Sequence, residues 1–108
     1  MTLNVFRNLH PHLLNKFKKE YGKKLQKIFS KYDSIDCAIT ISIYFTFKGK
    51  RRRDLDNHGT VILKVLQDAL VDSGVIPDDD TRVIDFISIG GETNCEEDTI
   101  KVTINERN

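Results

Sequence analysis

The chain has 108 residues, a formal net charge of +1, 39% hydrophobic residues and 31% charged residues. A chain of this length forms one domain with a modest hydrophobic core, so we expect a single domain over residues 1–108. It has no apolar N-terminal run to act as a signal peptide or membrane span, and its cysteines, Cys37 and Cys95, lack the spacing of metal ligands. We therefore expect a reduced, cytoplasmic protein.

The charges are divided unevenly along the chain. Residues 1–53 hold 13 Lys and Arg against 3 Asp and Glu, whereas residues 54–108 hold 4 against 13. A basic half beside an acidic half is typical of a phosphate-binding face next to a group of metal-binding carboxylates. Neutralisation of one half by the other within the molecule explains the division equally well.

Three periodic segments define the first two thirds of the chain. Apolar residues from 11 to about 32 recur at spacings of three and four, which predicts an amphipathic helix with a basic outer face. Residues 36–48 alternate strictly between apolar and polar, which predicts a long, half-buried strand. An apolar stripe over residues 58–72, followed by Gly74, predicts a second helix.

Two further strands are expected near the C-terminus. The first covers residues 83–89 and ends at Gly90-Gly91, and the second covers residues 99–105. We expect an acidic, polar loop over residues 92–98 between them. Helices and strands therefore combine in an α+β fold, with no repeat or linker that would divide it.

The most informative motif is the basic run Arg51–Arg53, followed at once by Asp54, Leu55 and Asp56. An enzyme that hydrolyses phosphodiesters needs cations to bind the backbone and hard oxygen ligands to hold a metal ion. If this segment is an extended strand end, Asp54 and Asp56 project to one side, where they can share a divalent ion, and Leu55 points toward the core. The alternative is a solvated turn with a helix N-cap.

A second acidic feature is the triplet Asp78-Asp79-Asp80. Adjacent carboxylates repel one another unless a cation offsets their charge. The triplet either caps a turn after Pro77, supplies a further ligand to the same metal ion, or is a solvated loop. The spacing does not match a calcium-binding EF-hand loop, and the three histidines lack the spacing of zinc ligands.

Lys64 lies in the second predicted helix, on a row of polar residues that leads back toward Asp56. It reaches the carboxylates only if the start of the helix is close to them. The alternative is an exposed ion pair with Asp68, four residues later.

These motifs, in this order, resemble the RusA-type Holliday junction resolvases of bacteria and their phages. The resemblance covers roughly the C-terminal two thirds of the chain: the segment 51–57, Lys64 before Asp68-Ala69-Leu70, the segment 74–80 and the two closing strands. It implies a homodimer in the cytoplasm of a bacterial or phage-infected cell, with a small mixed β-sheet flanked by two helices. It also implies binding of four-way DNA junctions and symmetric, Mg²⁺-dependent nicking of two strands that leaves 5′-phosphates and 3′-hydroxyls.

The resemblance assigns roles by position. Asp54 and Asp56 match two catalytic, metal-binding aspartates. Lys64 matches the catalytic lysine when counted from Asp68, but it lies about one helical turn, or ~6 Å, farther from Asp56 than in the best-known members. The expected phosphate-binding cations, which do not read bases, are Lys48, Lys50, Arg51, Arg52 and Arg53.

The third metal-binding aspartate lies within the triplet. Asp79 matches it when counted from Gly74, and Asp80 matches it when counted back from residues 83–85. Asp78 is also close enough in sequence to help bind the metal. We take Asp79 as the best match and keep its two neighbours as alternatives.

The N-terminus departs from the family. Residues 2–4 and Arg7 look like the loop that follows the family's first strand, so that strand is expected to be short or absent. This departure suggests one rival function, and a second arises because the motif does not specify which form of branched DNA is cut. One is a DNA-binding remnant that no longer cuts, and the other is a nuclease for other branched DNA.

Overall fold

The computed structural model describes residues 2–7, 14–50 and 55–107, with side chains for 21–50, 55 and 59–107. The elements follow one another as β1 (Thr2–Arg7), α1 (Leu14–Phe29), β2 (Ala38–Lys48), α2 (Leu55–Asp72), β3 (Ile84–Cys95) and β4 (Thr99–Arg107). The predicted α+β class is confirmed. Among the described residues, no helix combines the length and the apolar character needed to cross a membrane.

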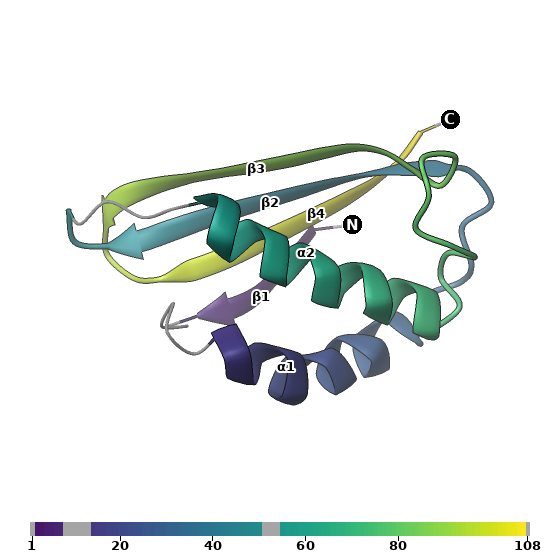
Figure 1. Cartoon of the computed structure of the whole chain (residues 1–108), viewed down its shortest axis with the longest axis horizontal. Coiled ribbons are helices and arrows are strands. Elements are labelled where there is room, and N and C mark those ends of the chain that lie inside the picture. Colours follow the sequence, from purple (N-terminus) through teal and green to yellow (C-terminus); the bar gives the residue numbers. More distant parts are fainter. Residues whose placement is uncertain (1, 8–13, 51–54, 108) are drawn as a thin grey trace.

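The four strands form one mixed sheet in the order β1-β4-β2-β3. The central strand β2 pairs antiparallel with β4 and parallel with β3. Both helices cover the same face of the sheet, and no described element covers the other face (Figure 1). That open face carries hydroxyl side chains, and the Ser88 hydroxyl donates to the Ser42 hydroxyl at 3.0 Å.

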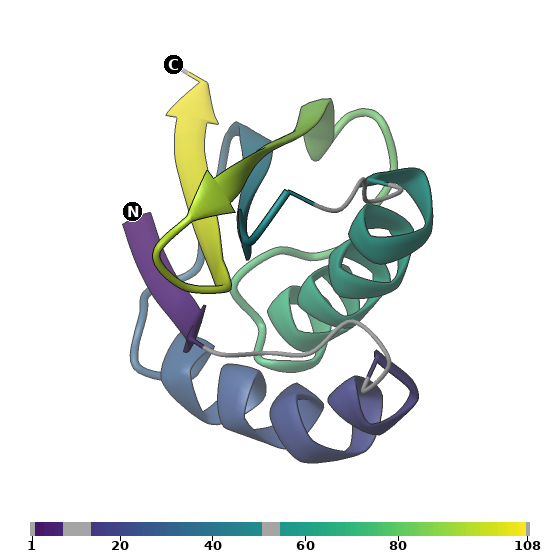
Figure 2. The ribbon, with the colours of Figure 1, turned by 90° about the vertical axis from the view of Figure 1, so that its left-hand side faces the viewer.

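The alternation in β2 places its odd-numbered residues against the helices. Ile39, Ile41 and Ile43 are fully buried, whereas Tyr44 on the open face is 41% exposed. The helices complete the core with the buried side chains Leu25, Phe29, Ile62, Leu66 and Leu70. Figure 2 shows the resulting two layers, with the sheet on one side and the helix pair on the other.

The predicted boundaries need several corrections. α1 ends at Phe29, three residues before the expected end, and the second helix begins at Leu55 instead of residue 58. The third strand does not end at Gly90-Gly91 but continues to Cys95, because β2 offers it a pairing partner as far as Lys48. Residues 92–95 therefore belong to β3, and only residues 96–98 connect it to β4.

Gly91 lies within β3 and has a packing role there. A Cβ atom at this position would lie 3.0 Å from Leu55 Cδ2 and 3.1 Å from the Phe45 carbonyl oxygen. The glycine thus allows the start of α2 to approach β3 closely.

The N-terminal segment also differs from the expected loop. Thr2–Arg7 forms the six-residue strand β1, which pairs antiparallel with β4 across a register shift between Asn4 and Phe6. Residues that the sequence predicted to form a loop therefore form a short strand, the shortest of the four described strands. Its backbone groups find partners because β2 occupies only one edge of β4.

Ile43→Ala is expected to lower the free energy of unfolding by about 2–5 kcal/mol, because it removes a fully buried side chain from the central strand and leaves a cavity. Urea unfolding followed by circular dichroism measures the change. The control is Asn105→Ala at an exposed position of β4, which is expected to stay within about 0.5 kcal/mol of the wild type. A loss below 1 kcal/mol for Ile43→Ala would contradict the packing described here.

Candidate functional site

Three elements meet at the end of the molecule that faces the viewer in Figure 2. The parallel strands β2 and β3 both have their carboxyl ends there, with Lys48 opposite Cys95. α2 begins at the same end, because Leu55 lies next to Gly91. The carboxyl ends of parallel strands and the N-terminus of a helix together form a usual place for binding anions.

A surface hollow of about 430 Å³ lies at this end, lined by Phe47, Leu55, Gly91, Glu92 and Thr93. The Phe45 and Phe47 rings stack beside it, with their centroids 5.5 Å apart. Leu55 is partly buried against the core, which confirms the expected direction of this side chain. The hollow is therefore fixed by core packing.

The turn after β2 is held by backbone hydrogen bonds. Lys48 N–H donates to the Asp98 carboxylate at 2.8 Å, and Asn94 N–H donates to the Gly49 carbonyl. Gly49 has a φ of 84°, a value that glycine adopts without strain. The side chains of Lys48 and Lys50 are exposed at this turn, so both are available to an anionic partner.

The central motif is only partly described. Arg51, Arg52, Arg53 and Asp54 lie outside the described residues, and so does the side chain of Asp56. Of the two alternatives for this segment, the extended strand end is wrong for Leu55 and Asp56, because Leu55 is the first residue of α2 and Asp56 lies in its first turn. Leu55 packs its side chain against the core beside Gly91, at the start of the helix.

Asp79 lies at the opposite end of the molecule from Leu55. The 18 residues of α2 separate the two ends and span about 27 Å at 1.5 Å per residue. The Asp80 carbonyl accepts hydrogen bonds from Val83 and Ile84, where β3 begins, and Val83 in turn accepts from Ile39 near the start of β2. One chain therefore does not bring Asp79 to the end where Asp56 lies, and no described residues form a group of three metal ligands.

Arg82 offsets part of the charge of the triplet. Its guanidinium lies 2.9 Å from Asp80 Oδ2, and its backbone N–H donates to Asp80 Oδ1 at 2.9 Å. The side-chain and backbone hydrogen bonds from Arg82 lower the pKa of Asp80. Asp79 N–H donates to the Asp78 carboxylate, but no ion pair within the described residues involves Asp78 or Asp79.

Lys64 forms the exposed ion pair that the sequence suggested. Its Nζ lies 3.2 Å from Asp68 Oδ1, and the two side chains are 66% and 43% exposed. Because α2 is continuous from Leu55, Lys64 lies about 12 Å along the helix axis from Asp56. In this structure its charge is directed toward Asp68, away from the start of the helix.

Glu92 is a carboxylate that the sequence reasoning missed. The glycine pair suggested a strand end and assigned Glu92 to a loop, but it lies on β3 opposite Thr46 and lines the hollow. It also acts on its neighbour Tyr44: partial shielding from solvent raises the pKa of Tyr44, and the charge and hydrogen bond of Glu92 raise it further. Glu92 thus places a described carboxylate at the same end as Asp56.

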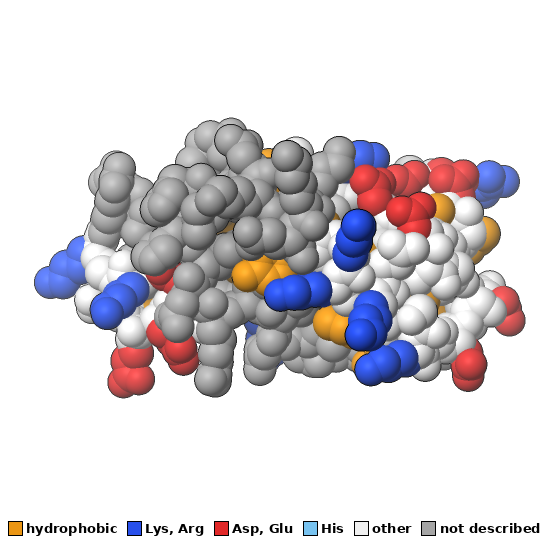
Figure 3. Space-filling model, turned by 90° about the horizontal axis from the view of Figure 1, so that it is seen from below, with side chains coloured by type: hydrophobic (Ala, Val, Ile, Leu, Met, Phe, Trp, Pro, Cys, Tyr) orange, Lys and Arg blue, Asp and Glu red, His pale blue; other side chains and the backbone are white. Residues whose placement is uncertain are grey.

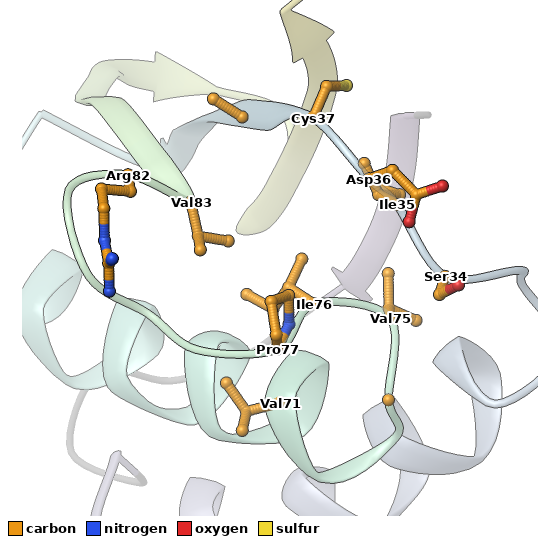
Figure 4. A pocket seen from close by; sticks show the side chains of 12 residues that line it. Ser34, Ile35, Asp36, Cys37, Val71, Val75, Ile76, Pro77, Arg82 and Val83 are labelled. Carbon is orange, nitrogen blue, oxygen red and sulfur yellow. The ribbon is translucent and has the colours of Figure 1, made fainter.

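A second hollow, of about 470 Å³, lies at the other end of the molecule (Figure 4). Its lining combines apolar side chains, such as Val71, Pro77 and Val83, with polar groups, and Asp36 and Arg82 are the charged side chains in it. Asp79 does not line it. No described hydrogen bond or ion pair joins the polar side chains that line it, and we assign no function to this hollow.

In its described part, the surface seen in Figure 3 carries both basic and acidic side chains among uncharged ones. The exposed lysines here include Lys23, Lys24 and Lys27 on α1 and Lys31 just after it. Lys24 Nζ lies 5.1 Å from the centre of the Tyr21 ring. These lysines form no ion pair within the described part of the chain, so the basic outer face predicted for this helix is confirmed for its second half.

Comparison with known protein-family models finds no match to this chain, and comparison with curated proteins likewise finds no relative.

Asp80→Asn is expected to lower the melting temperature at pH 7, because it removes the ion pair with Arg82. Since the pKa of Asp80 is lowered in the folded state, its contribution is complete above the unfolded value of about 3.9 and is lost as the pH falls through the lower, folded value. The difference between the two proteins should therefore shrink below about pH 4. Thermal unfolding from pH 7 to pH 3 measures it, and a difference that stays constant would contradict the assignment.

Proposed function

We propose that this protein is a Mg²⁺-dependent endodeoxyribonuclease that resolves four-way DNA junctions by symmetric phosphodiester hydrolysis. One observation carries the proposal: the segment with three arginines and two aspartates joins the carboxyl end of β2 to the start of α2. Anionic ligands commonly bind at such a connection, where a parallel strand ends and a helix begins. The order of motifs, which resembles that of the RusA-type resolvases, supports the same function.

The cations of the segment would bind the DNA backbone. Lys48 and Lys50 are exposed where β2 leaves the sheet, and Arg51–Arg53 follow them directly in the sequence. Contacts to phosphates position DNA without reading its bases, so this group fits recognition of a branched shape. The positive end of the α2 dipole adds to the attraction of phosphate.

The donor set fits Mg²⁺. This ion is usually held by one or two carboxylates together with substrate phosphates, and Asp54 and Asp56 provide two carboxylates beside the cations that would hold the phosphate. When bound, the ion would activate a water molecule and offset the charge that develops on the scissile phosphate. The two aspartates then have two tasks, which are to hold the ion and to lower the net positive charge of the arginine run.

The third expected ligand, Asp79, can join this site only from a second copy of the chain. Within one chain the full length of α2 separates it from Asp56. The homodimer that the resemblance implies would offer the Asp79 of the other copy. Lys64 would act as an additional cation only if DNA or the second copy displaces its ion pair with Asp68.

The placement of Asp79 also favours a second candidate, a junction-binding protein that does not cut. A chain whose third aspartate never meets the other two would bind DNA through its cations and remain indifferent to Mg²⁺. The same fold and the same basic end serve this function. A cleavage assay separates it from the nuclease.

Asp56→Asn is expected to reduce the cleavage of a labelled four-way junction in Mg²⁺ by at least about a hundredfold, because loss of a group that merely supports a metal ligand already costs 10–100-fold. Junction binding should be unchanged or tighter, since one negative charge is removed. The matched control, Asp33→Asn, changes an exposed aspartate outside the motif and should cleave like the wild type. Tight binding without cleavage by the wild type in any divalent metal would favour the binding protein.

Mixing two inactive variants tests whether the site is shared between copies. In a heterodimer of Asp56→Asn and Asp79→Asn, a shared arrangement leaves one site with both aspartates, whereas sites within single chains all lack one of them. We therefore expect mixing after partial unfolding and refolding to restore up to about a quarter of the wild-type nicking, as only half of the random dimers are mixed and each has one intact site. Activity no higher than that of the separate variants would contradict the shared site.

A further inference from the structure

The open face of the sheet carries two exposed aromatic side chains. Tyr44 on β2 is 41% exposed, and Phe86 on β3 is 59% exposed. Phe86 lies opposite Thr40, which is four residues before Tyr44 on the same side of β2. Both rings therefore lie on the face that no described helix covers (Figure 1). Exposed rings on one face of a sheet are a feature of surfaces that bind their ligands by stacking.

The Tyr44 ring is held in place by its neighbours. A Cβ atom at Gly90, the residue opposite Tyr44 on β3, would lie 3.3 Å from Cδ1 and 3.4 Å from Cε1 of the ring. The ring therefore leans over β3 into the space that the glycine leaves, and its hydroxyl is hydrogen-bonded to Glu92 on the same strand. A ring that is fixed before binding loses little conformational freedom when a planar ligand stacks on it.

Small hydroxyl side chains lie between the two rings. Ser42 and Ser88 oppose each other in the register and are joined by the hydrogen bond described above. Thr103 on β4 lies opposite Ser42 on its other side. These short side chains leave a shallow polar surface between the rings, with little apolar area for a protein partner to bury. The face therefore suits a planar, polar ligand better than another protein.

The lysines of this face are available to an anion. Lys101 on β4 lies opposite Tyr44, and Lys48 lies four residues after Tyr44 on the same side of β2. Both lysines are exposed, and neither forms an ion pair within the described residues. Beyond Lys48 the chain enters the basic segment that ends at Arg53. Positive charge therefore continues from the open face to the proposed DNA-binding end.

The acidic side chains of the three long strands do not cancel this charge. β2 has none, and the two in β3 have partners: Glu92 is hydrogen-bonded to Tyr44, and Asp85 lies 3.4 Å from Arg107. Glu106 on β4 lies in the register of the helix face. The combination of flat rings and unpaired lysines is the chemistry that binds a polyanion with planar groups.

Unpaired bases fit these features better than a duplex does. The bases of a duplex are stacked on one another, whereas a single strand exposes its base faces to aromatic side chains. Tyr44 and Phe86 are four residues apart along the strands and one strand apart across them, which is about 14 Å. About four nucleotides at the 3.4 Å rise of a stacked strand cover this distance.

We infer that the open face of the sheet binds single-stranded DNA whose bases stack on Tyr44 and Phe86. Lys48 and Lys101 contact its phosphates. The inference rests on the proposed function and deepens it, because the strand continues from this face onto the basic segment after Lys48. The substrate class is thereby branched DNA with an unpaired strand next to the branch.

Fluorescence anisotropy of a labelled oligothymidylate, about 12 nucleotides long, tests the inference with the full chain in EDTA. Tyr44→Ala should weaken binding by about 5- to 150-fold, the range that loss of one base–aromatic stack produces. Tyr44→Phe keeps the ring and should bind like the wild type. The matched control, Tyr32→Ala, removes a tyrosine of similar exposure, 44%, outside the sheet and should also bind like the wild type.

Phe86→Leu supplies a second variant, because it keeps an apolar side chain at an exposed position but removes the ring. It should weaken oligothymidylate binding by a similar factor, leave duplex affinity unchanged and keep the wild-type circular dichroism spectrum. Lys101→Gln should lower the slope of log affinity against log salt concentration by about 0.7, the value for one phosphate contact. Unchanged oligothymidylate affinity in either aromatic variant, an equal loss of duplex affinity, or an unchanged salt slope would overturn the inference.

The rival occupant of this face is a second copy of the chain. Light scattering without DNA separates the two, since Tyr44→Ala and Phe86→Leu should have the same molar mass as the wild type. If either variant converts a dimeric wild type into a monomer, the face is an interface between copies and the inference is overturned.

These binding measurements require neither Mg²⁺ nor cleavage. If the wild type cleaves junctions but the aromatic variants bind oligothymidylate normally, the nuclease stands and the single-strand site fails. If the variants lose oligothymidylate binding and no metal supports cleavage by the wild type, the single-strand site stands and the nuclease fails.

Discussion

The parallel pairing of β2 with β3 is the constraint on which the rest of this structure depends. Two parallel neighbours require a crossover connection that returns to the starting end of the sheet, and α2 with the segment after it provides that return. The motifs at the two ends of the crossover are therefore held apart by the length of the helix. The same pairing gathers the ends of β2 and β3, the start of α2 and the basic segment at one end of the molecule.

This constraint explains which parts of the fold the sequence predicts. The strict alternation of residues 36–48 and the apolar stripes of both helices are local patterns, and each predicted its element to within three or four residues at the described ends. β1 was missed as a strand because the pairing that the structure describes for it is with β4, which lies at the far end of the sequence. The glycine pair in β3 was misread because its cause, the close approach of Leu55, is a tertiary contact.

In the site, too, the sequence predicts contacts between residues close in the chain but not those set by the overall fold. Spacing along a helix predicted the Lys64–Asp68 ion pair, because such contacts depend on residues one turn apart. Spacing could not predict that Asp79 lies a helix length away from Asp56, nor that Glu92 shares the end where α2 begins. These placements depend on the direction in which α2 crosses the sheet, and a second copy is the simplest way to reconcile them with a site of three aspartates.

Paramagnetic relaxation by Mn²⁺, used in place of Mg²⁺, tests the central claim most directly, because it reports which backbone amides lie near a bound metal ion without requiring catalysis. The account predicts that in the wild-type protein the NMR signals flanking Asp56 and those flanking Asp79 broaden at the same low Mn²⁺ concentration. Broadening confined to one aspartate, or absent from both, would contradict the proposed shared metal site.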